Sequence, residues 1–115
     1  MEYKPGDLIL IPFPFSDLTS HKKRPALILK EKDYFGDFLA VPLTSQPQHQ
    51  QSIELDNKDL SRGELPKKSW LRVDKIYTLN DCLIIKKIGT LKPAFFKRSK
   101  QSICEHIGCC YKVNF

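Results

Sequence analysis

The sequence predicts a mainly β domain that forms a small, strongly curved barrel and carries one C-terminal α-helix. Two observations lead to this fold class. Short apolar runs separated by turn residues fill most of the first 90 positions, and the final segment changes to helical periodicity. A chain of 115 residues is long enough to bury one core. It holds no internal repeat or linker, so we expect a single domain over residues 1–115.

Three strands are expected in the first half of the chain. Residues 7–13 carry apolar side chains on both faces, which is typical of a central strand. Residues 25–31 and 37–44 read as two further strands joined by a turn at 32–36. Pro42 lacks the N–H that a sheet ladder uses, so we expect its strand to lie at an edge or to contain a bulge that redirects its end.

Three more strands are expected in the second half. Residues 52–55 form a short strand, 69–79 the longest strand and 82–90 its return. The connection at 56–68 is expected to contain one helical turn.

The last element is expected to be a helix that begins near Pro93 and ends at Gly108. Proline suits the first turn of a helix, and glycine suits its end. Apolar or small residues recur on one side at helical spacing: Phe95, Phe96, Ser99, Ile103, Ile107 and Cys110. This side should pack against the barrel.

Basic residues outnumber acidic ones and give a formal net charge of +6. This excess favours a polyanionic partner such as nucleic acid or an acidic protein, although charge alone leaves simple solubility open as its role. No apolar run reaches the length of a membrane span, and the first ten residues lack the layout of a signal peptide. We therefore expect a cytoplasmic protein without membrane contact.

No metal or cofactor is expected. The four cysteines lack the CxxC pairs of a zinc site and are predicted to be free thiols: Cys82, Cys104, Cys109 and Cys110. The sequence also has no phosphate-binding P-loop and no carboxylate cluster for two metal ions. Any hydrolytic chemistry should therefore be metal-independent.

Arg24 stands where a cationic loop meets a strand, in the segment HKKRPALIL at 21–29. Pro25 biases the preceding residue toward an extended conformation. The guanidinium should therefore be held at the rim of the sheet, where it could bind a phosphate. An arginine before proline is, however, more often an ordinary surface residue.

Arg72 and Asp74 lie two residues apart in the longest expected strand. This spacing places them on one face, about 7 Å apart. An acid and a base held rigidly at that distance could serve phosphodiester cleavage in RNA. An ordinary ion pair on a solvated sheet face is the alternative that the spacing alone favours.

Four segments in order along the chain carry a resemblance to one family: GDLILIPF at 6–13, HKKRPALIL at 21–29, VPLTS at 41–45 and SWLRVDKI at 69–76. With them, the chain resembles the MazF/PemK toxins over roughly residues 5–93. The resemblance implies an SH3-like barrel and the toxin role in a type II toxin–antitoxin system. It also implies a metal-independent, sequence-selective endoribonuclease that cleaves single-stranded RNA through its 2′-hydroxyl to a 2′,3′-cyclic phosphate. The implied partners are a second copy of the chain and a cognate antitoxin with an acidic, disordered C-terminal segment.

The resemblance also assigns roles to individual residues. It implies catalytic roles for Arg24, Thr44, Arg72 and Asp74, with Arg24 stabilising charge on the scissile phosphate. The residues expected to contact RNA lie in loops and strand ends that should converge on one rim: His21, Lys22, Lys23, Ser45, Lys67, Lys68, Ser69 and Trp70. Cationic side chains there would follow the phosphates, with Phe15, Trp70 or Tyr77 available to stack on a base.

Two departures from the family pattern limit what can be carried over. The loop at 14–23 differs from the glycine- and glutamate-containing loop of many members, so the RNA cleavage motif is not implied. The ending from Cys104 onward matches no family feature. A non-catalytic toxin resembling the CcdB gyrase poisons, or an SH3-like module that binds RNA or protein without cutting, are the alternatives.

Overall fold

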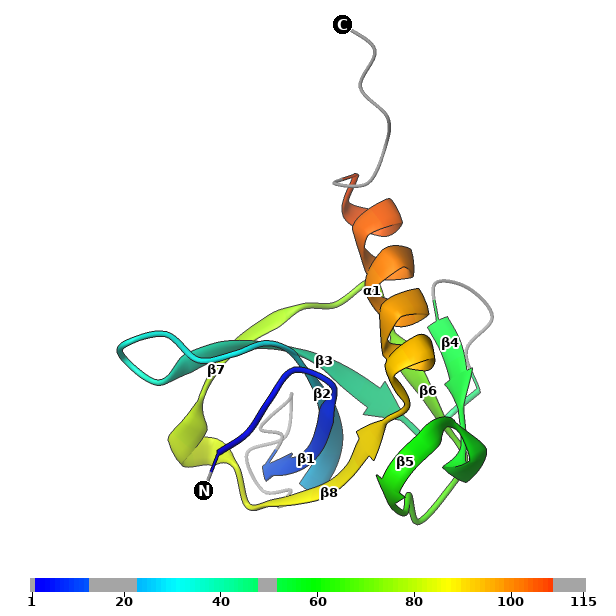
Figure 1. Ribbon diagram of the computed structural model, residues 1–115, viewed down its shortest axis with the longest axis horizontal. Coiled ribbons are helices and arrows are strands. Elements are labelled where there is room, and N and C mark those ends of the chain that lie inside the picture. The colour runs from blue at the N-terminus through cyan, green and yellow to red at the C-terminus, as the bar shows by residue number, and fades with distance from the viewer. Residues whose placement is uncertain (1, 13–22, 48–51, 109–115) are drawn as a thin grey trace, which may run out of the picture.

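The computed structural model describes residues 2–12, 23–47 and 52–108 and shows a curled β-sheet with one C-terminal helix (Figure 1). This confirms the predicted fold class. The strands are β1 (Asp7–Pro12), β2 (Lys23–Lys30), β3 (Asp37–Thr44), β4 (Ser52–Leu55), β5 (Leu60–Gly63), β6 (Ser69–Arg72), β7 (Tyr77–Asn80) and β8 (Lys86–Leu91). Two 3₁₀ turns, η1 (Asn57–Asp59) and η2 (Asp81–Leu83), precede β5 and β8, and the helix is α1 (Pro93–Ile107).

The sheet has the strand order β4-β6-β3-β2-β1-β8-β5, and β7 pairs with β3 beside β6. β1 is central, as its two apolar faces predicted. β3 is not an edge strand, because it pairs with β2 on one side and with β7 and then β6 on the other. On that second side β7 pairs up to Ala40 and β6 pairs from Leu43. Pro42 lies in the gap between the two partners, where its missing N–H breaks neither ladder.

The prediction of one long strand at 69–79 is wrong. β6 ends at Arg72, Val73 and Asp74 form a turn, and β7 begins at Tyr77. The N–H of Lys75 donates to the carbonyl of Arg72 at 3.2 Å and closes this turn. Both pieces pair with β3, so the chain bends where one partner strand takes over from the other.

The connection at 56–68 contains the expected single turn of helix, η1, but also β5, which was not predicted. β5 pairs with β8 and places Gly63 opposite Gly89. A Cβ on Gly63, whose φ is +81°, would come within 2.1 Å of the Ile88 carbonyl oxygen. The two backbones can approach this closely only because glycine stands there.

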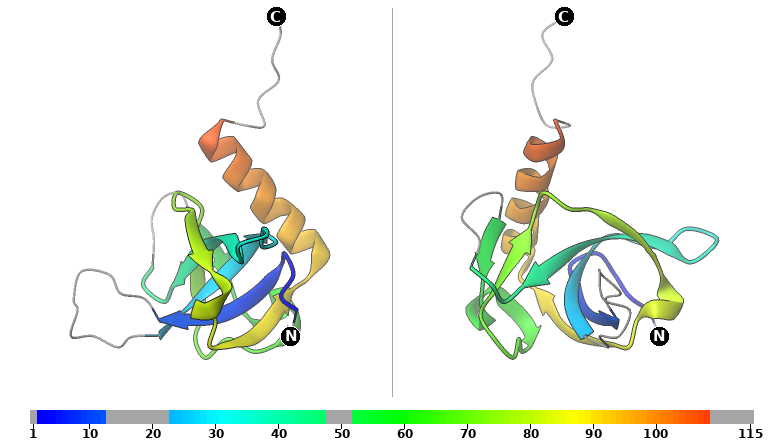
Figure 2. Two further views of the ribbon diagram at one scale, coloured as in Figure 1. Left: turned by 90° about the vertical axis from the view of Figure 1, so that its left-hand side faces the viewer. Right: turned by 180° about the vertical axis from the view of Figure 1, so that it is seen from behind.

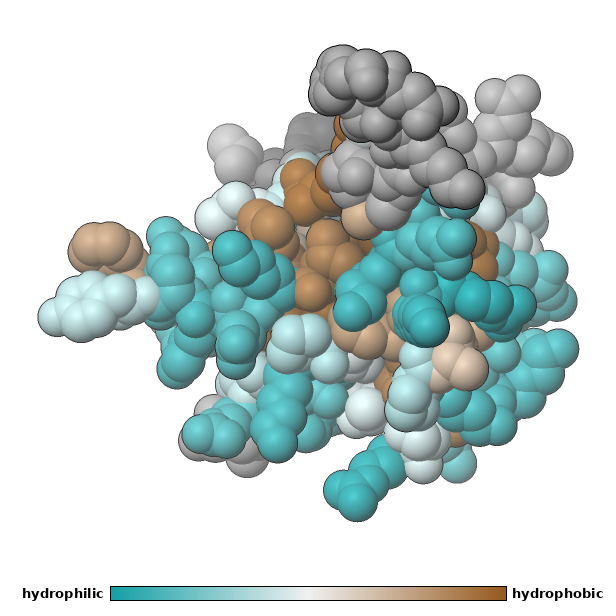
Figure 3. All heavy atoms as spheres, turned by 45° about the horizontal axis from the view of Figure 1, so that its top comes forward, coloured by the Kyte–Doolittle hydropathy of each residue, from teal (hydrophilic) through white to brown (hydrophobic). Residues whose placement is uncertain are grey.

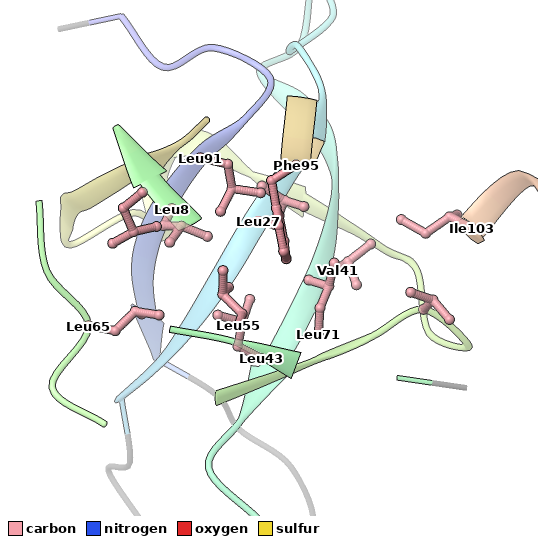
Figure 4. Close-up of a cluster of buried hydrophobic side chains, with 12 residues drawn as sticks. Leu8, Leu27, Val41, Leu43, Leu55, Leu65, Leu71, Leu91, Phe95 and Ile103 are labelled. Carbon is pink, nitrogen blue, oxygen red and sulfur yellow. The ribbon is translucent and has the colours of Figure 1, made fainter. Parts of the chain in front are cut away.

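Two apolar clusters fill the two faces of the sheet. The larger gathers side chains from most strands and from α1, which point toward one another in Figure 4: Leu8, Leu27, Val41, Leu43, Leu55, Leu60, Leu65, Leu71, Val73, Leu91, Phe95 and Ile103. The smaller lies on the opposite face: Ile9, Ile11, Ala26, Ile28, Phe38 and Ala40. Neighbouring residues of β1, β2 and β3 alternate between the clusters, which explains why these strands are apolar on both faces.

The helix begins with Pro93 in its first turn and ends at Gly108, whose φ is +83°, as predicted. α1 rises from one side of the sheet (Figure 2), and Phe95, Ser99 and Ile103 are its buried residues. Ile107 is 56% exposed, so its expected packing is wrong: the helix continues beyond the core. Cys110 lies outside the described residues. Among the helices that are described, none is both long enough and apolar enough to cross a membrane.

Candidate nucleic-acid interface

A groove of about 460 Å³ opens where β2 begins and β3 ends. It gathers six of the residues that the sequence singled out, contributed by β2, by the end of β3 and by the segment that enters β6: Lys23, Arg24, Thr44, Ser45, Lys67 and Ser69. The remaining lining residues are Pro25, Leu43, Gln46 and Pro66. The described residues that line this groove include three cations and no acid.

Arg24 and Thr44 are brought together by the register of the strands. β2 and β3 pair antiparallel, and Ala26 opposite Pro42 is the pair nearest the groove. Arg24 and Thr44 each lie two residues beyond this pair, on the same face as its members. Thr44 in turn lies opposite Trp70 of β6. Paired residues of antiparallel strands point to the same face. Arg24, Thr44 and Trp70 therefore form one row across three strands, here called the site row.

Two hydroxyl groups at the groove hold its loops in place. The Thr44 Oγ1 accepts a hydrogen bond from the N–H of Gln46 at 3.1 Å, which leaves the hydroxyl proton available for a ligand. The buried Ser69 Oγ donates to the carbonyl of Lys67 at 3.0 Å and shapes the segment that carries this lysine. Thr44 can thus donate to an oxyanion.

Lys68 does not line the groove. Its ammonium forms an ion pair with Glu54 of β4, and the hydrogen bond to this carboxylate raises the pKa of Lys68. Glu54 lies directly opposite Trp70 in the β4–β6 pair. The site row is therefore bordered on its β4 side by an acidic residue whose charge Lys68 balances.

Arg72 and Asp74 form an ion pair at the end of β6 and do not line the groove. The Arg72 Nε and Nη2 donate to the two carboxylate oxygens of Asp74 at 3.0 and 2.9 Å. These hydrogen bonds lower the pKa of the Asp74 carboxyl, and about a quarter of each side chain is exposed. The expected separation of 7 Å in a continuous strand is wrong, because Asp74 lies in the turn after β6. Arg72 itself remains on the same face as Trp70, two residues along the strand.

Phe15 lies outside the described residues, as do two of the expected RNA contacts, His21 and Lys22. Lys23 follows them directly and is exposed at the first position of β2. A second hollow of about 390 Å³ shares Lys23, Pro25 and Pro66 with the groove. It adds residues that the sequence did not single out: Leu10, Glu64, Leu65, Lys86 and Ile88. The doublet Lys86–Lys87 at the start of β8 was the one sequence signal for this extension.

This arrangement is suited to a chain of phosphates beside flat or apolar groups. Arginine and lysine bind phosphate oxygens, and a guanidinium can donate two parallel hydrogen bonds to one phosphate. The Leu10, Leu65 and Ile88 side of the second hollow is apolar and is flanked by Lys23 and Lys86. The geometry therefore fits a polyanion that also carries groups able to pack.

Comparison with protein families identifies the family of this chain. The model of the PemK-like, MazF-like toxins of type II toxin–antitoxin systems matches residues 4–107. The chain belongs to this family. The resemblance found in the sequence is thereby confirmed, together with the toxin role that it implied. A comparison with curated protein sequences gives no match.

Solved structures show the same PemK/MazF fold. An endoribonuclease in complex with its cognate antitoxin, from a mycobacterial species, has a TM-score of 0.74 at 18% identity. The match covers 96% of this chain and all of that one. A MazE–MazF complex from Deinococcus radiodurans has a TM-score of 0.70 at 16% identity and covers 94% and 97% of the two chains. A MazF toxin of Mycobacterium tuberculosis has a TM-score of 0.65 at 18% identity, with 95% and 99% covered.

Proposed function

We propose that this PemK/MazF-family toxin is a metal-independent endoribonuclease that cleaves single-stranded RNA in the groove at the open end of β2 and β3. The proposal rests on the groove, which gathers Arg24 and Thr44 beside Lys23 and Lys67. The same family has relatives of this fold that are described as endoribonucleases. Because mRNA is the substrate class, the site of action would be the cytoplasm.

In the proposed reaction the 2′-oxygen of a ribose attacks the adjacent phosphorus. The bond from phosphorus to the 5′-oxygen of the next nucleotide breaks, leaving a 2′,3′-cyclic phosphate and a 5′-hydroxyl. One proton leaves the 2′-hydroxyl, and one is delivered to the departing oxygen. Arg24 would stabilise the extra negative charge that develops on the phosphate oxygens, and the Thr44 hydroxyl would donate to one of them.

The ion pair between Arg72 and Asp74 supports a positioning role for these two residues in place of the expected catalytic one. A carboxylate that accepts two hydrogen bonds from a guanidinium is a weak base. If it took a proton from the substrate it would lose its charge, and both hydrogen bonds to the guanidinium would weaken. We propose that the pair fixes the turn after β6 and so positions Trp70, which stands between Thr44 and Glu54. A direct catalytic role would require the ion pair to open. Trp70 would stack on a base next to the scissile phosphate.

The proposed partners are the cognate antitoxin and a second copy of the chain. An acidic, disordered antitoxin segment would compete with RNA for the groove. Its carboxylates would pair with Lys23 and Lys86, and its apolar side chains would pack against the Leu10, Leu65 and Ile88 side of the second hollow. A homodimer is supported by apolar side chains that gather on the face between the β2–β3 hairpin and α1 (Figure 3). Apolar residues that are only partly buried against the larger cluster include Leu29, Ile76 and Phe96.

The test is an assay with purified protein and a long single-stranded RNA in excess EDTA. Primer extension should map a small set of cuts, and mass spectrometry should find 2′,3′-cyclic phosphate and 5′-hydroxyl ends. Intact RNA that nevertheless binds would instead identify a binding module. Intact RNA without binding, together with growth arrest in cells, would identify a non-catalytic toxin. Cutting that EDTA abolishes would overturn metal independence.

The shared groove is tested by charge reversal. Lys23→Glu should weaken both RNA and antitoxin binding, with RNA the more sensitive to salt because several phosphates release counterions. Lys97→Glu is the matched control, since Lys97 is exposed on α1. If a non-cleavable RNA and the antitoxin bind one toxin without displacing each other, the groove is not shared.

A further inference from the structure

Two aromatic side chains stand fully in solvent at the tip of the β2–β3 hairpin. Tyr34 is 96% exposed and Phe35 is 76% exposed. Their rings meet edge to face, with centroids 5.4 Å apart. The tip projects from the body of the molecule at the left of Figure 1 and again at the left of Figure 3. Aromatic side chains of this size are normally buried, so their joint exposure needs an explanation.

The turn that carries them is held rigid from within by Asp33. Its Oδ1 accepts hydrogen bonds from the N–H groups of Phe35 and Asp37, at 2.9 and 3.0 Å. The carbonyl of Asp33 accepts the N–H of Gly36 at 3.0 Å, and its own N–H donates to Asp37 at 2.8 Å. Gly36 has a φ of +85°, which only glycine adopts readily.

The same turn is held from outside by the last residue of β7 and the first residue of η2. The Asn80 Nδ2 donates to the carbonyl of Phe35 and to Asp37 Oδ1, both at 3.1 Å. The N–H of Asp81 donates to the carbonyl of Gly36 at 2.9 Å. Asp81 also forms an ion pair with Lys32 at 3.1 Å. A backbone fixed in this way displays Tyr34 and Phe35 at little further cost in conformational entropy on binding.

The charge around the tip disfavours a polyanion. A recess of about 220 Å³ beside the tip is lined by Glu31, Asp33 and Asp37 against a single lysine, Lys30. The cationic groove lies at the far end of the same strands, because the six residue steps from Arg24 to Lys30 extend about 20 Å. Phosphates would be repelled at the recess, whereas a lysine or arginine of a partner would be attracted.

The shape and area of the tip disfavour self-association through it. Two exposed aromatic side chains bury about 400 Å² when fully covered. A stable interface buries about 800 Å² on each partner, so two tips placed against each other are too small. A convex tip reaches that area only when it enters a cleft whose walls also cover the flanks of the hairpin.

We propose that Tyr34 and Phe35 form a preorganised docking anchor for a second protein that presents an apolar cleft with a basic rim. Aromatic anchors that fill a pocket commonly supply most of the binding energy of an interface. The basic rim of the partner would face the recess lined by Glu31 and Asp37. This interaction is independent of RNA cleavage and would leave the groove open.

The proposal is tested by photo-crosslinking with the full-length protein. Tyr34→p-benzoylphenylalanine is irradiated in a lysate of the host, and the crosslinked product is identified by mass spectrometry. Lys97→p-benzoylphenylalanine on α1 is the position control. The identified protein is then purified, and its affinity is measured for the unmodified chain, for the double variant Tyr34→Ser with Phe35→Ser, and for Glu31→Lys.

The expected result is one protein crosslinked from position 34 and not from position 97. Its affinity should fall at least tenfold for the double variant and severalfold for Glu31→Lys. RNA cleavage by the double variant should equal that of the unmodified chain, which separates this test from that of the groove. A crosslink to RNA, a crosslink only to a second copy, no crosslinked protein, or an affinity unchanged by the double variant would each overturn the proposal.

Discussion

At its open end the β2–β3 hairpin presents Arg24 and Thr44 to a cationic groove, whereas at its turn it presents Tyr34 and Phe35 to solvent. The open end is organised by strand pairing, which brings an arginine and a hydroxyl of neighbouring strands to one groove. The turn is organised by side chains that bind backbone groups, chiefly Asp33 and Asn80. One pair of strands thus carries two surfaces of different chemistry about 20 Å apart. Substitutions at the open end should therefore change RNA cleavage, whereas substitutions at the turn should not.

The largest effect should come from Arg24→Ala. Loss of its charge at the phosphate should slow single-turnover RNA cleavage at least about a hundredfold. Thermal unfolding should change little, since Arg24 lies at the groove and outside both apolar clusters. Lys97→Ala is the control and should cleave normally. Near-normal cleavage by Arg24→Ala would contradict a catalytic role for Arg24 at the open end.

Thr44→Val should have the next largest effect. It keeps the shape of the side chain but removes the hydroxyl that would donate to the phosphate, and a hydrogen bond to a charged group contributes about 1.5–3 kcal/mol. Cleavage should therefore slow by roughly tenfold to a hundredfold. Thr78→Val in β7 is the matched control, because Thr78 is exposed and distant from the groove. If both variants lose activity equally, Thr44 has no special role.

Asp33→Ala should affect the turn and leave the open end unchanged. It removes the acceptor for two backbone N–H groups and should cost about 1–2 kcal/mol of stability. Hydrogen exchange at the amides of Phe35 and Asp37 should accelerate, whereas RNA cleavage should stay within twofold. Glu31→Ala, an exposed neighbour, is the control for loss of charge. Unchanged exchange at both amides would show that Asp33 does not fix the tip.

Asp74→Asn should change the pH dependence of stability by a smaller amount. The pKa of Asp74 is lowered in the folded chain by its hydrogen bonds to Arg72, so the pair stabilises the fold at pH values above the ordinary carboxyl pKa of about 4. That contribution, at most about 1 kcal/mol for a partly exposed pair, is lost as the pH falls through the lowered pKa. Denaturant unfolding between pH 7 and pH 2 should therefore show a smaller acid loss for the variant than for the unmodified chain. An identical pH profile would exclude a stabilising ion pair.

Local patterns in the sequence were enough to predict the hairpin and the helix. The turn at 32–36 and the strand run that follows it defined residues 37–44 correctly, and Pro93 and Gly108 marked the ends of α1. Arg24 and Thr44 were both singled out from motifs. That they line the same groove follows from the strand pairing, which local patterns do not specify.

Features that depend on distant partners could not be predicted. Ser69, Leu71 and Val73 continue one strand pattern, yet the chain turns after Arg72 because β3 changes neighbours there. The close approach of β5 to β8 depends on Gly63 meeting Gly89, which no local pattern indicates. Ion pairing has the same character. The sequence placed Lys68 in the basic rim, but in the structure its ammonium forms an ion pair with Glu54 of the adjacent strand.

The most direct test of the account is an NMR titration of the isotope-labelled chain with a short single-stranded RNA that carries a 2′-deoxy substitution at the scissile nucleotide. The substitution removes the attacking hydroxyl, so binding can be followed without cleavage. Amide shifts should concentrate at Lys23, Arg24, Thr44, Ser45 and Lys67, while the amides of Tyr34, Phe35 and Gly36 stay unchanged. Shifts centred on the tip, with the open end unaffected, would contradict this prediction.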